Sequence, residues 1–443
     1  MTRHTWLVVL AIAALPSSAA AQDPLTIDQA VQAALTQNAA LRATRASRDE
    51  ADALIGAARS GFFPRLTVTE SWQRGDQPVF VFSSLLSARQ FGAQNFAIDA
   101  LNHPDPIGFF RGAVGIEQLI FDGGRQRAAA DAAGLRRDIA SLATDEMAAG
   151  LALATTQMFG RVVVAQTAHR AADAGVKAAR EDLARAERRR DGGMLTDADV
   201  LGLAVHVADL QQRAIQFESD GAIARAELNR LMGVPIERDY QIAEPVASDR
   251  AASAEPRLDV LFAEADAARP DMQRAAAAQQ LAATGRGQAR AALIPQMAAQ
   301  ALFDVSGTRF NDRASSWLVG GEVRWTFSLG GAELAHMKAS LEAVRRARAE
   351  ADDARSAVHV EVVSALRRLD AAHARQAVGR AAVEQARESQ RIIRDRFDAG
   401  LIGVNDVLRA STAVLDADAQ MIFALVDAMS SDAMLRRALG RTK

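Results

Sequence analysis

The feature that most constrains this chain is an internal duplication, in which a unit of about 200 residues occurs twice at an offset of 207 residues. Gly193 aligns with Gly400 at this offset, and the tripeptide Asp-Val-Leu that begins at Asp199 recurs at Asp406. A repeat of this length is far longer than the units of a solenoid protein. It indicates that one half of a fold was duplicated and fused.

Each half pairs Ala-rich helical stretches with two short stretches of alternating residues. A proline precedes the first such stretch, at Pro64 and Pro295, and a glycine pair follows the second. The glycine pairs are Gly123 and Gly124 in the first half, and Gly330 and Gly331 in the second. Because glycine tolerates positive φ, we interpret these positions as tight turns from strand to helix and not as phosphate-binding loops.

Residues 1–21 have the pattern of a signal peptide. Arg3 and His4 precede an apolar run of about ten residues, and small residues typical of a cleavage site follow at 19–21. A membrane-spanning helix needs about 20 apolar residues, so a permanent anchor is the weaker interpretation. The chain contains no cysteine, which excludes disulfides, thiol catalysis and a lipid on an N-terminal cysteine. We therefore expect an exported protein without N-terminal lipidation.

Charge and motif content exclude several function classes. The formal net charge is -2 and the pI is near 6.4, so no basic field points to nucleic acid. The histidines lack the spacing of metal ligands, and no nucleotide-binding or hydrolase motif occurs. We expect no enzyme, no metal or cofactor site and no nucleic-acid partner.

Four stretches alternate between apolar and polar residues as β-strands do, at about 66–74, 110–120, 296–305 and 316–327. Each has roughly the 9 to 11 residues that a tilted strand needs to cross a bilayer. Three of the four tryptophans, Trp72, Trp317 and Trp325, fall in these stretches. We interpret them as membrane-interface aromatics that flank an apolar band.

Four strands are too few to close a barrel, and an open sheet edge is not tolerated in lipid. Two copies would give eight strands, whose interior is filled by side chains, whereas three copies would give twelve strands and a passage. A channel therefore argues for a homotrimer in contact with outer membrane lipid. We expect residues 75–109 to form a long outer link, and a link of about ten residues to join the second strand pair.

The remaining sequence is predominantly helical, with helices expected at about 26–61, 125–190, 197–232, 270–292, 332–397 and 405–439. The two longest contain no proline, would each extend about 100 Å, and have a coiled-coil-like seam of small residues. Gly192 and Gly193 in one hairpin, and Gly400 in the other, would turn each long helix into a shorter returning helix. We expect the helix at 270–292 to stack on the first returning helix, and the helix at 26–60 to stack on the second.

These expectations define a mixed α+β membrane protein with an internal duplication. Its long α-helical hairpins would form a periplasmic α-barrel, and its four transmembrane β-strands per protomer would complete a trimeric twelve-stranded β-barrel. The first repeat occupies 22–233, with its hairpin tip at about 191–199, and the second occupies 270–443, with its tip at about 398–406. Residues 234–269, which are rich in proline, form an insert that we expect to run as a belt around the helices.

Several motifs occur in a characteristic order. They are Phe-Asp-Gly-Gly-Arg at 121–125, Leu-Met-Gly-Val-Pro at 231–235, and, in both tips, a glycine followed six residues later by Asp-Val. In this order the chain resembles the TolC-type outer membrane efflux protein family, the outer membrane factors of tripartite export systems. The resemblance implies a trimeric channel that serves as an exit duct for efflux or type I secretion. It also implies two partners, a periplasmic adaptor (membrane fusion) protein and an inner-membrane pump of the RND, ABC or MFS class.

Two other classes remain as alternatives. A periplasmic coiled-coil adaptor, or another structural protein of an envelope export complex, would also have long helical hairpins. Such a protein needs no aromatic strands like those around Trp72 and Trp317. A passive porin would need far more strand than helix.

The resemblance also bears on the second hairpin tip. In the best-known member of the family, two aspartates three residues apart ring the closed periplasmic end. Asp406 matches the first of these, but Arg409 stands at the position of the second. We therefore take Asp406, Arg409 and Asp199 as candidates for the periplasmic aperture. The alternative is that the two aspartates only cap the returning helices and that Arg409 pairs with Asp406 one turn away.

Overall fold

The computed structural model describes residues 24–243 and 257–441, so the expected signal peptide and part of the proline-rich insert lie outside the described residues. The described chain divides into two compact units, each assembled from three separate segments. Unit 1 contains residues 24–38, 150–243 and 366–435, and unit 2 contains residues 39–149, 257–365 and 436–441.

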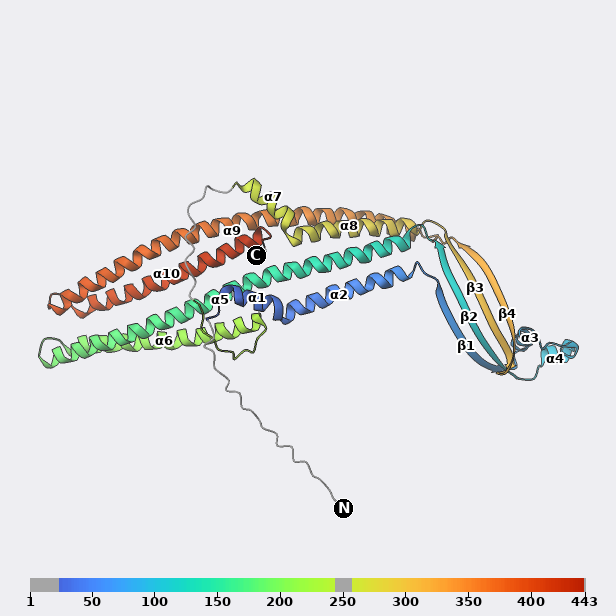
Figure 1. The fold of residues 1–443 in the computed structure, drawn as a ribbon, viewed down its shortest axis with the longest axis horizontal. Coiled ribbons are helices and arrows are strands. Elements are labelled where there is room, and N and C mark those ends of the chain that lie inside the picture. The colour runs from blue at the N-terminus through green and yellow to red at the C-terminus, as the bar shows by residue number, and fades with distance from the viewer. Residues whose placement is uncertain (1–23, 244–256, 442–443) are drawn as a thin grey trace, which may run out of the picture. The chain divides into compact units, whose positions relative to one another are not determined.

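The sheet of unit 2 has four antiparallel strands in the order β1-β2-β3-β4 (Figure 1). The strands are β1 Arg65–Gly75, β2 Ile107–Phe121, β3 Gln296–Arg309 and β4 Asp312–Arg324. The register places Trp72 opposite Phe110 and Phe303 opposite Trp317 on one face. On the other face, Asp304 accepts hydrogen bonds from Arg111 and Ser316 at 2.9 and 3.0 Å. One face is therefore apolar and aromatic, and the other is polar.

The two links between paired strands differ from the sequence-based prediction. Only Phe310 and Asn311 separate β3 from β4, where about ten residues were expected, because the strand ladder extends to the pair Arg309 and Asp312. Since β4 ends at residue 324, Trp325 lies just beyond it, in edge-to-face contact with Phe327 at 5.0 Å between ring centroids. The link between β1 and β2 contains α3 Pro78–Ser87, the 3-10 helix η1 Ala93–Phe96 and α4 Ile98–Asn102.

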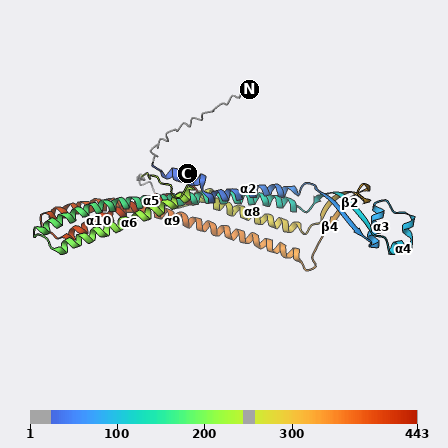
Figure 2. The same cartoon turned by 90° about the horizontal axis from the view of Figure 1, so that it is seen from below.

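The helices of both hairpins match the prediction within one residue at each end. The long helices are α5 Arg125–Asp191 and α9 Ala332–Asp398, and the returning helices are α6 Asp197–Met232 and α10 Val404–Ala438 (Figure 2). Both long helices contribute residues to each unit, since the units divide at residues 149 and 365. The absence of proline and the continuous 3.6-residue pattern explain why these helices run without interruption.

The N-terminal helix predicted at 26–61 is two helices, α1 Ile27–Gln37 and α2 Ala39–Ser60. Asn38 separates them in an extended conformation, with φ -60° and ψ 129°. Thr26 caps α1 through a reciprocal pair of hydrogen bonds with Gln29. The second half repeats this arrangement with α7 Leu258–Ala268 and α8 Pro270–Ala291, which Arg269 separates at φ -73° and ψ 130°.

The predicted stacking of these shorter helices on the returning helices is wrong. In unit 1, the Asn38 amide donates to the Leu231 carbonyl at the end of α6, at 2.9 Å. In unit 2, the Arg269 guanidinium donates to the Ala438 carbonyl at the end of α10, at 3.2 Å. Each returning helix therefore ends against the helix pair of its own repeat. Helix lengths alone had permitted either arrangement.

The core of unit 1 is built from small and branched side chains of four helices. Phe159 and Val162 of α5 pack with Ala30 of α1, Leu228 of α6 and Val426 of α10. Among the described residues, α5 is also the helix that is long and apolar enough by composition to cross a membrane. Three of its apolar side chains, Phe159, Val162 and Val163, are buried in this core, and 39% of its most apolar stretch is buried in the structure.

Candidate functional site

The candidate site is the end of unit 1 where both hairpins turn. Residues 192–196 join α5 to α6, and residues 399–403 join α9 to α10. Gly193 and Gly400 both have φ of 74°, and a Cβ added at either position would meet nothing within 4 Å. Glycine is therefore favoured at these two turns by backbone conformation and not by a lack of space.

The two returning helices begin differently, although Asp199 and Asp406 occupy equivalent positions. Asp199 and Thr196 form a reciprocal capping box, with backbone-to-side-chain distances of 3.1 and 3.3 Å. At Asp406 the equivalent N-terminal residue is Gly403, which has no side chain to complete such a box. A carboxylate in the first turn still stabilises the helix dipole.

Arg409 lies beside Asp406, as the helical spacing predicts. A guanidinium nitrogen of Arg409 lies 3.9 Å from a carboxylate oxygen of Asp406, and Arg409 is highly exposed. An exposed pair at this distance stabilises a helix by about 0.5 kcal/mol or less. The arrangement permits both the capping role and a role at an aperture.

A buried apolar cluster joins the two tips. It contains Ala186, Val200 and Leu203 of the first hairpin and Phe397, Val404 and Val407 of the second. The two tips therefore pack against each other and do not project separately.

Arg189 connects the same two hairpins, and the sequence gave no reason to select it. Its guanidinium donates to the backbone carbonyls of Phe397 and Asp398 at 3.0 and 2.8 Å. It also lies over the Phe397 ring, 5.1 Å from the centroid. The last carbonyls of a helix have no partner within the helix. Arg189 of α5 thus donates hydrogen bonds to the last carbonyls of α9. Its acceptors lie 208 and 209 residues away in the chain, so no local sequence pattern points to them.

Asp182 makes a second polar connection between the hairpins. Its side chain is largely buried, and it pairs with Arg185 on the same helix and with Arg394 of α9, the latter at 3.5 Å. A buried carboxylate needs such partners, since its desolvation is otherwise costly. Asp182 and Arg189 thus make two polar connections between the hairpins in addition to the apolar tip cluster.

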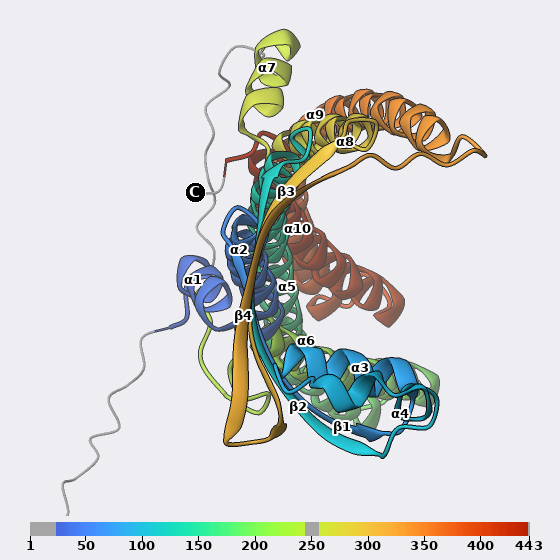
Figure 3. The same ribbon diagram turned by 90° about the vertical axis from the view of Figure 1, so that its right-hand side faces the viewer.

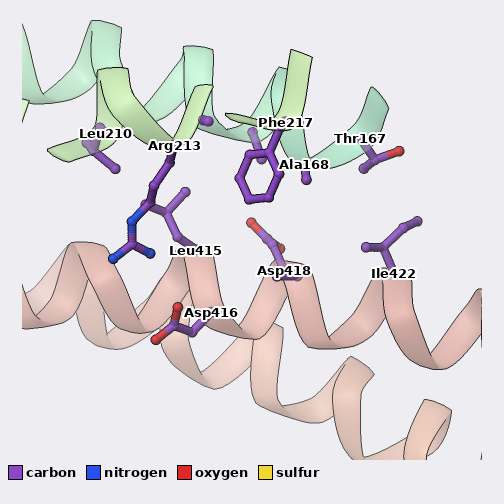
Figure 4. Close-up of a pocket in the computed structure, with 12 residues that line it drawn as sticks. Thr167, Ala168, Leu210, Arg213, Phe217, Leu415, Asp416, Asp418 and Ile422 are labelled. Carbon is purple, nitrogen blue, oxygen red and sulfur yellow. The ribbon is translucent and has the colours of Figure 1, made fainter. Parts of the chain in front are cut away.

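A cavity of about 180 Å³ lies farther from the tips, between α5, α6 and α10 (Figure 4). Its walls include Leu210, Phe217 and Leu415. Two charged groups at its edge have partners in the chain, since Arg213 pairs with Asp209 and Asp418 pairs with Arg387, both at 3.0 Å. No group of three or more potential metal ligands occurs within residues 24–243 and 257–441. The cavity is best described as a gap in helix packing.

The remaining residues singled out from the sequence lie far from the tips along the chain. Pro64 and Pro295 precede β1 and β3. Gly123, Gly124 and Gly331 have positive φ at the turns that lead from strands into α5 and α9. The side chains of Trp72, Trp317 and Trp325 are exposed.

A family model described as outer membrane efflux protein matches residues 30–234 and 261–441. The fold is similar to that of the outer membrane channel CmeC from Campylobacter jejuni, with a TM-score of 0.82 and 14% identity over 94% of this chain and 86% of that one. It is also similar to VceC from Vibrio cholerae, with a TM-score of 0.76 and 16% identity over 94% and 96% of the two chains. The open-state channel MtrE from Neisseria gonorrhoeae gives a TM-score of 0.75 and 17% identity over 94% and 88%. No curated protein matches the sequence significantly.

Proposed function

The chain belongs to the outer membrane efflux protein family, and from this premise we propose that three copies of it form the exit duct of a tripartite export system. Members of this family are channels and not enzymes, and they act with adaptors and inner-membrane pumps. The family match favours the channel over the adaptor that the sequence left as an alternative. The trimer, the identity of the partners and the roles of the tip residues are parts of the proposal.

The observation that carries the proposal is the four-stranded sheet. Within the described residues, β1 and β4 are its edges, and neither edge pairs with another strand of the same chain. Its apolar face, with Trp72 and Trp317 exposed, suits lipid, whereas its other face contains Arg111 and Asp304. Unpaired edges are too costly in hydrocarbon to persist. Neighbouring copies therefore supply the missing pairing, and twelve strands are enough to surround a passage.

Double-cysteine variants test this pairing directly, because the natural chain contains no cysteine. One cysteine replaces Thr67 or Thr69 of β1, and the other replaces Leu318 or Gly320 of β4. Within one chain these strands are about 14 Å apart, three strand spacings, so a disulfide forms only between copies. We expect ladders of up to three linked copies on denaturing gels and a trimeric mass by light scattering in detergent. A monomeric mass with no linked species would contradict the proposal.

We assign the hairpin tips to the periplasmic end, where they would contact the adaptor. Met194 and Leu401 are equivalent positions in the two turns, and both side chains are exposed. A photo-reactive residue at either position should capture a periplasmic protein in cells. The same residue at Phe91, in the link between β1 and β2, is the matched control and should not. Capture only from Phe91 would place the docking end on the opposite side.

The aperture role of Asp406 and Arg409 has a separate test. If the two side chains help to close the channel, Asp406→Asn and Arg409→Glu should both raise the single-channel conductance of the purified protein. Asp199→Asn is the comparison variant, because Asp199 is the third aperture candidate but is engaged in a capping box that Asp406 lacks. Unchanged conductance and ion preference in both variants would leave only the capping role.

A further inference from the structure

The link between β1 and β2 contains an unusual apolar segment for a loop at the end of a membrane sheet. Residues 77–88, which include α3, contain no charged side chain. A surface loop without charge and with several large apolar residues exposes an apolar patch, and such patches commonly mark interaction sites.

One side of α3 packs against the polar face of the sheet (Figure 3). Phe80 contacts Phe109 of β2 edge to face, at 6.3 Å between ring centroids. Ser306 of β3 is buried and donates to the Ser87 carbonyl at 3.4 Å. Because alternate residues share a face, Phe109 and Ser306 lie on the same side as Arg111 and Asp304. In a barrel with an apolar exterior this polar side is the interior.

The segment after α3 is hydrogen-bonded to residues at the turn between β3 and β4. Arg89, which has φ of 56°, donates to the Ser315 carbonyl at 2.9 Å. The Gln90 amide donates to Asp312 at 3.2 Å and accepts from Thr308 at 2.7 Å. These bonds hold the link on the inner side of the sheet and away from the face that bears Trp72 and Trp317.

The side of the link that faces away from the sheet has no cover within the described residues of this chain. Val79 is 82% exposed and Ile98 is 80% exposed, and Leu86 and Phe96 are also exposed. An aromatic cluster of Phe82, Phe91 and Phe96 lies beside them. Because α3 packs on the polar face of the sheet, its exposed side chains Val79 and Leu86 lie on the side that would face the interior of a barrel.

The dimensions fit a closed arrangement. Twelve strands about 4.8 Å apart and tilted by about 40° close a barrel about 24 Å across. α3 has ten residues and is therefore about 15 Å long and about 10 Å wide with its side chains. Three copies cover an area comparable with the mouth of such a barrel.

We propose that residues 77–98 of three copies meet on the axis and form an apolar seal at the outer end of the channel. The partner of this surface is the same segment of the two neighbouring copies, so the inference rests on the trimer of the proposed function. Insertion of α3 into the lipid is disfavoured, because the helix packs on the polar face and not on the tryptophan-bearing face. The channel would then be gated at its outer end as well as at the hairpin tips.

Single-cysteine variants test the contact. Val79→Cys and Ile98→Cys, treated with a short bismaleimide in outer membranes, should each give species of two linked copies. Val319→Cys, which is 68% exposed and lies on the apolar face of β4, is the control and should remain unlinked. Light scattering on the same samples reports the trimer independently.

The seal itself is tested by access to the barrel interior. Thr67→Cys places a thiol on the polar face of β1, at the end farther from the link. A bulky impermeant maleimide added outside cells should label this thiol slowly. When Val79→Asp and Leu86→Asp are added to the Thr67→Cys variant, the labelling rate should rise about tenfold or more. A tenfold rise corresponds to destabilisation of the closed contact by about 1.4 kcal/mol. The seal would be overturned, and the proposed function left intact, if the protein is a trimer but copies are not linked through residues 79 and 98. The same holds if Thr67→Cys is labelled at the same rate with and without the two aspartate substitutions. Labelling of α3 by a lipid-soluble photo-reagent would also overturn it, and a monomeric mass would overturn both.

Discussion

Each returning helix ends at a junction with a pair of shorter helices. At the two junctions, chemically different side chains donate a hydrogen bond to a carbonyl at the end of the returning helix. At the first, the neutral amide of Asn38 donates to the Leu231 carbonyl at 2.9 Å. At the second, the charged Arg269 donates to the Ala438 carbonyl at 3.2 Å. In both, the acceptor lies two residues before a glycine with positive φ. The backbone arrangement is the same, and only the side chain that completes it differs.

The spacing of these residues shows which positions are equivalent in the two repeats. Residues 38 and 269 are 231 apart, as are Pro64 and Pro295, whereas the two acceptors are 207 apart, as are the tip glycines. The donor and acceptor therefore occupy equivalent places in the two repeats. A free carbonyl at a helix end requires a donor of suitable reach, and the charge of that donor is open to change.

A buried cation imposes further requirements that an amide does not. Arg269 is buried, and it pairs with Asp271 at 2.6 Å and with Glu361 at 2.8 Å. Glu361 also pairs with Arg437 at 2.6 Å. Burial alone would lower the pKa of Arg269, but the carboxylates outweigh it and raise the pKa above its ordinary value. The second junction thus depends on a network, in which removal of Arg269 leaves Asp271 without this partner and leaves Glu361 with Arg437.

The largest expected effect comes from removing the donor at each junction. Arg269→Met leaves Asp271 and Glu361 without their shared cation, and we expect a loss of about 3 to 5 kcal/mol of unfolding free energy. Asn38→Leu leaves one carbonyl without this donor, and we expect a loss of about 1 to 3 kcal/mol. Urea unfolding in detergent measures both, and Arg269→Lys should recover part of the first loss. Equal losses would contradict the distinction between the junctions.

The glycines after each acceptor should show effects smaller than that of Arg269→Met. A Cβ on Gly233 would lie 2.4 Å from the Gln37 carbonyl oxygen, whereas one on Gly193 would meet nothing within 4 Å. Both have positive φ, so alanine strains each by about 1 kcal/mol, and the clash at Gly233 adds about 1 to 3 kcal/mol. Gly233→Ala should therefore lower the midpoint of urea unfolding more than Gly193→Ala does. The same order is expected for Gly440→Ala against Gly400→Ala.

Acid pH should destabilise the second junction more than the first, by less than the substitutions above. Burial alone would raise the pKa of Asp271, but the hydrogen bond and charge of Arg269 outweigh it and lower the pKa below its ordinary value. The stability that this pair contributes is complete above the unfolded pKa of about 3.9 and is lost as the pH falls through the lower folded pKa. Wild type should therefore lose more stability below about pH 4 than Asp271→Asn does. An Asn38→Leu variant should keep the wild-type acid dependence, and a reduced dependence would contradict this assignment.

The smallest effect belongs to a surface pair found beside the second junction. Arg441 contacts Glu264 through two hydrogen bonds, at 2.6 and 2.9 Å. The hydrogen bond from Arg441 lowers the pKa of Glu264, but both side chains are partly exposed. Glu264→Gln should cost less than about 1 kcal/mol, and the difference from wild type should vanish at high salt. A difference that persists in high salt would mean that the pair is more than a screened surface contact.

Much of the fold was predictable because its signals are local. The long helices follow from continuous periodicity without proline, and the two hairpin turns follow from Gly193 and Gly400. The turn between β3 and β4 was missed because Ser306, Gly307 and Thr308 interrupt the alternation that marks a strand. Local patterns therefore define elements well and their ends poorly.

The residues that join elements were predictable only in part. Asp406 and Arg409 were found because one helical turn separates them. Arg189 and Arg269 were not, because their acceptors lie 208 and 169 residues away. In a chain with 52 cationic residues, an arginine that completes a distant helix end has no local mark that distinguishes it from one on a solvated face.

The assembly of each unit from three separate segments has a consequence for how the protein is made. Unit 1 takes its last segment from residues 366–435, and unit 2 takes its last from residue 436 onward. A chain is synthesised from its N-terminus, so neither unit has all its segments until most of α10 has been made. Ala438 and Arg437, which complete the Arg269 network, arrive among the last. Until then the apolar seams of the helices already made lack their partners, and such exposed seams favour association with other chains.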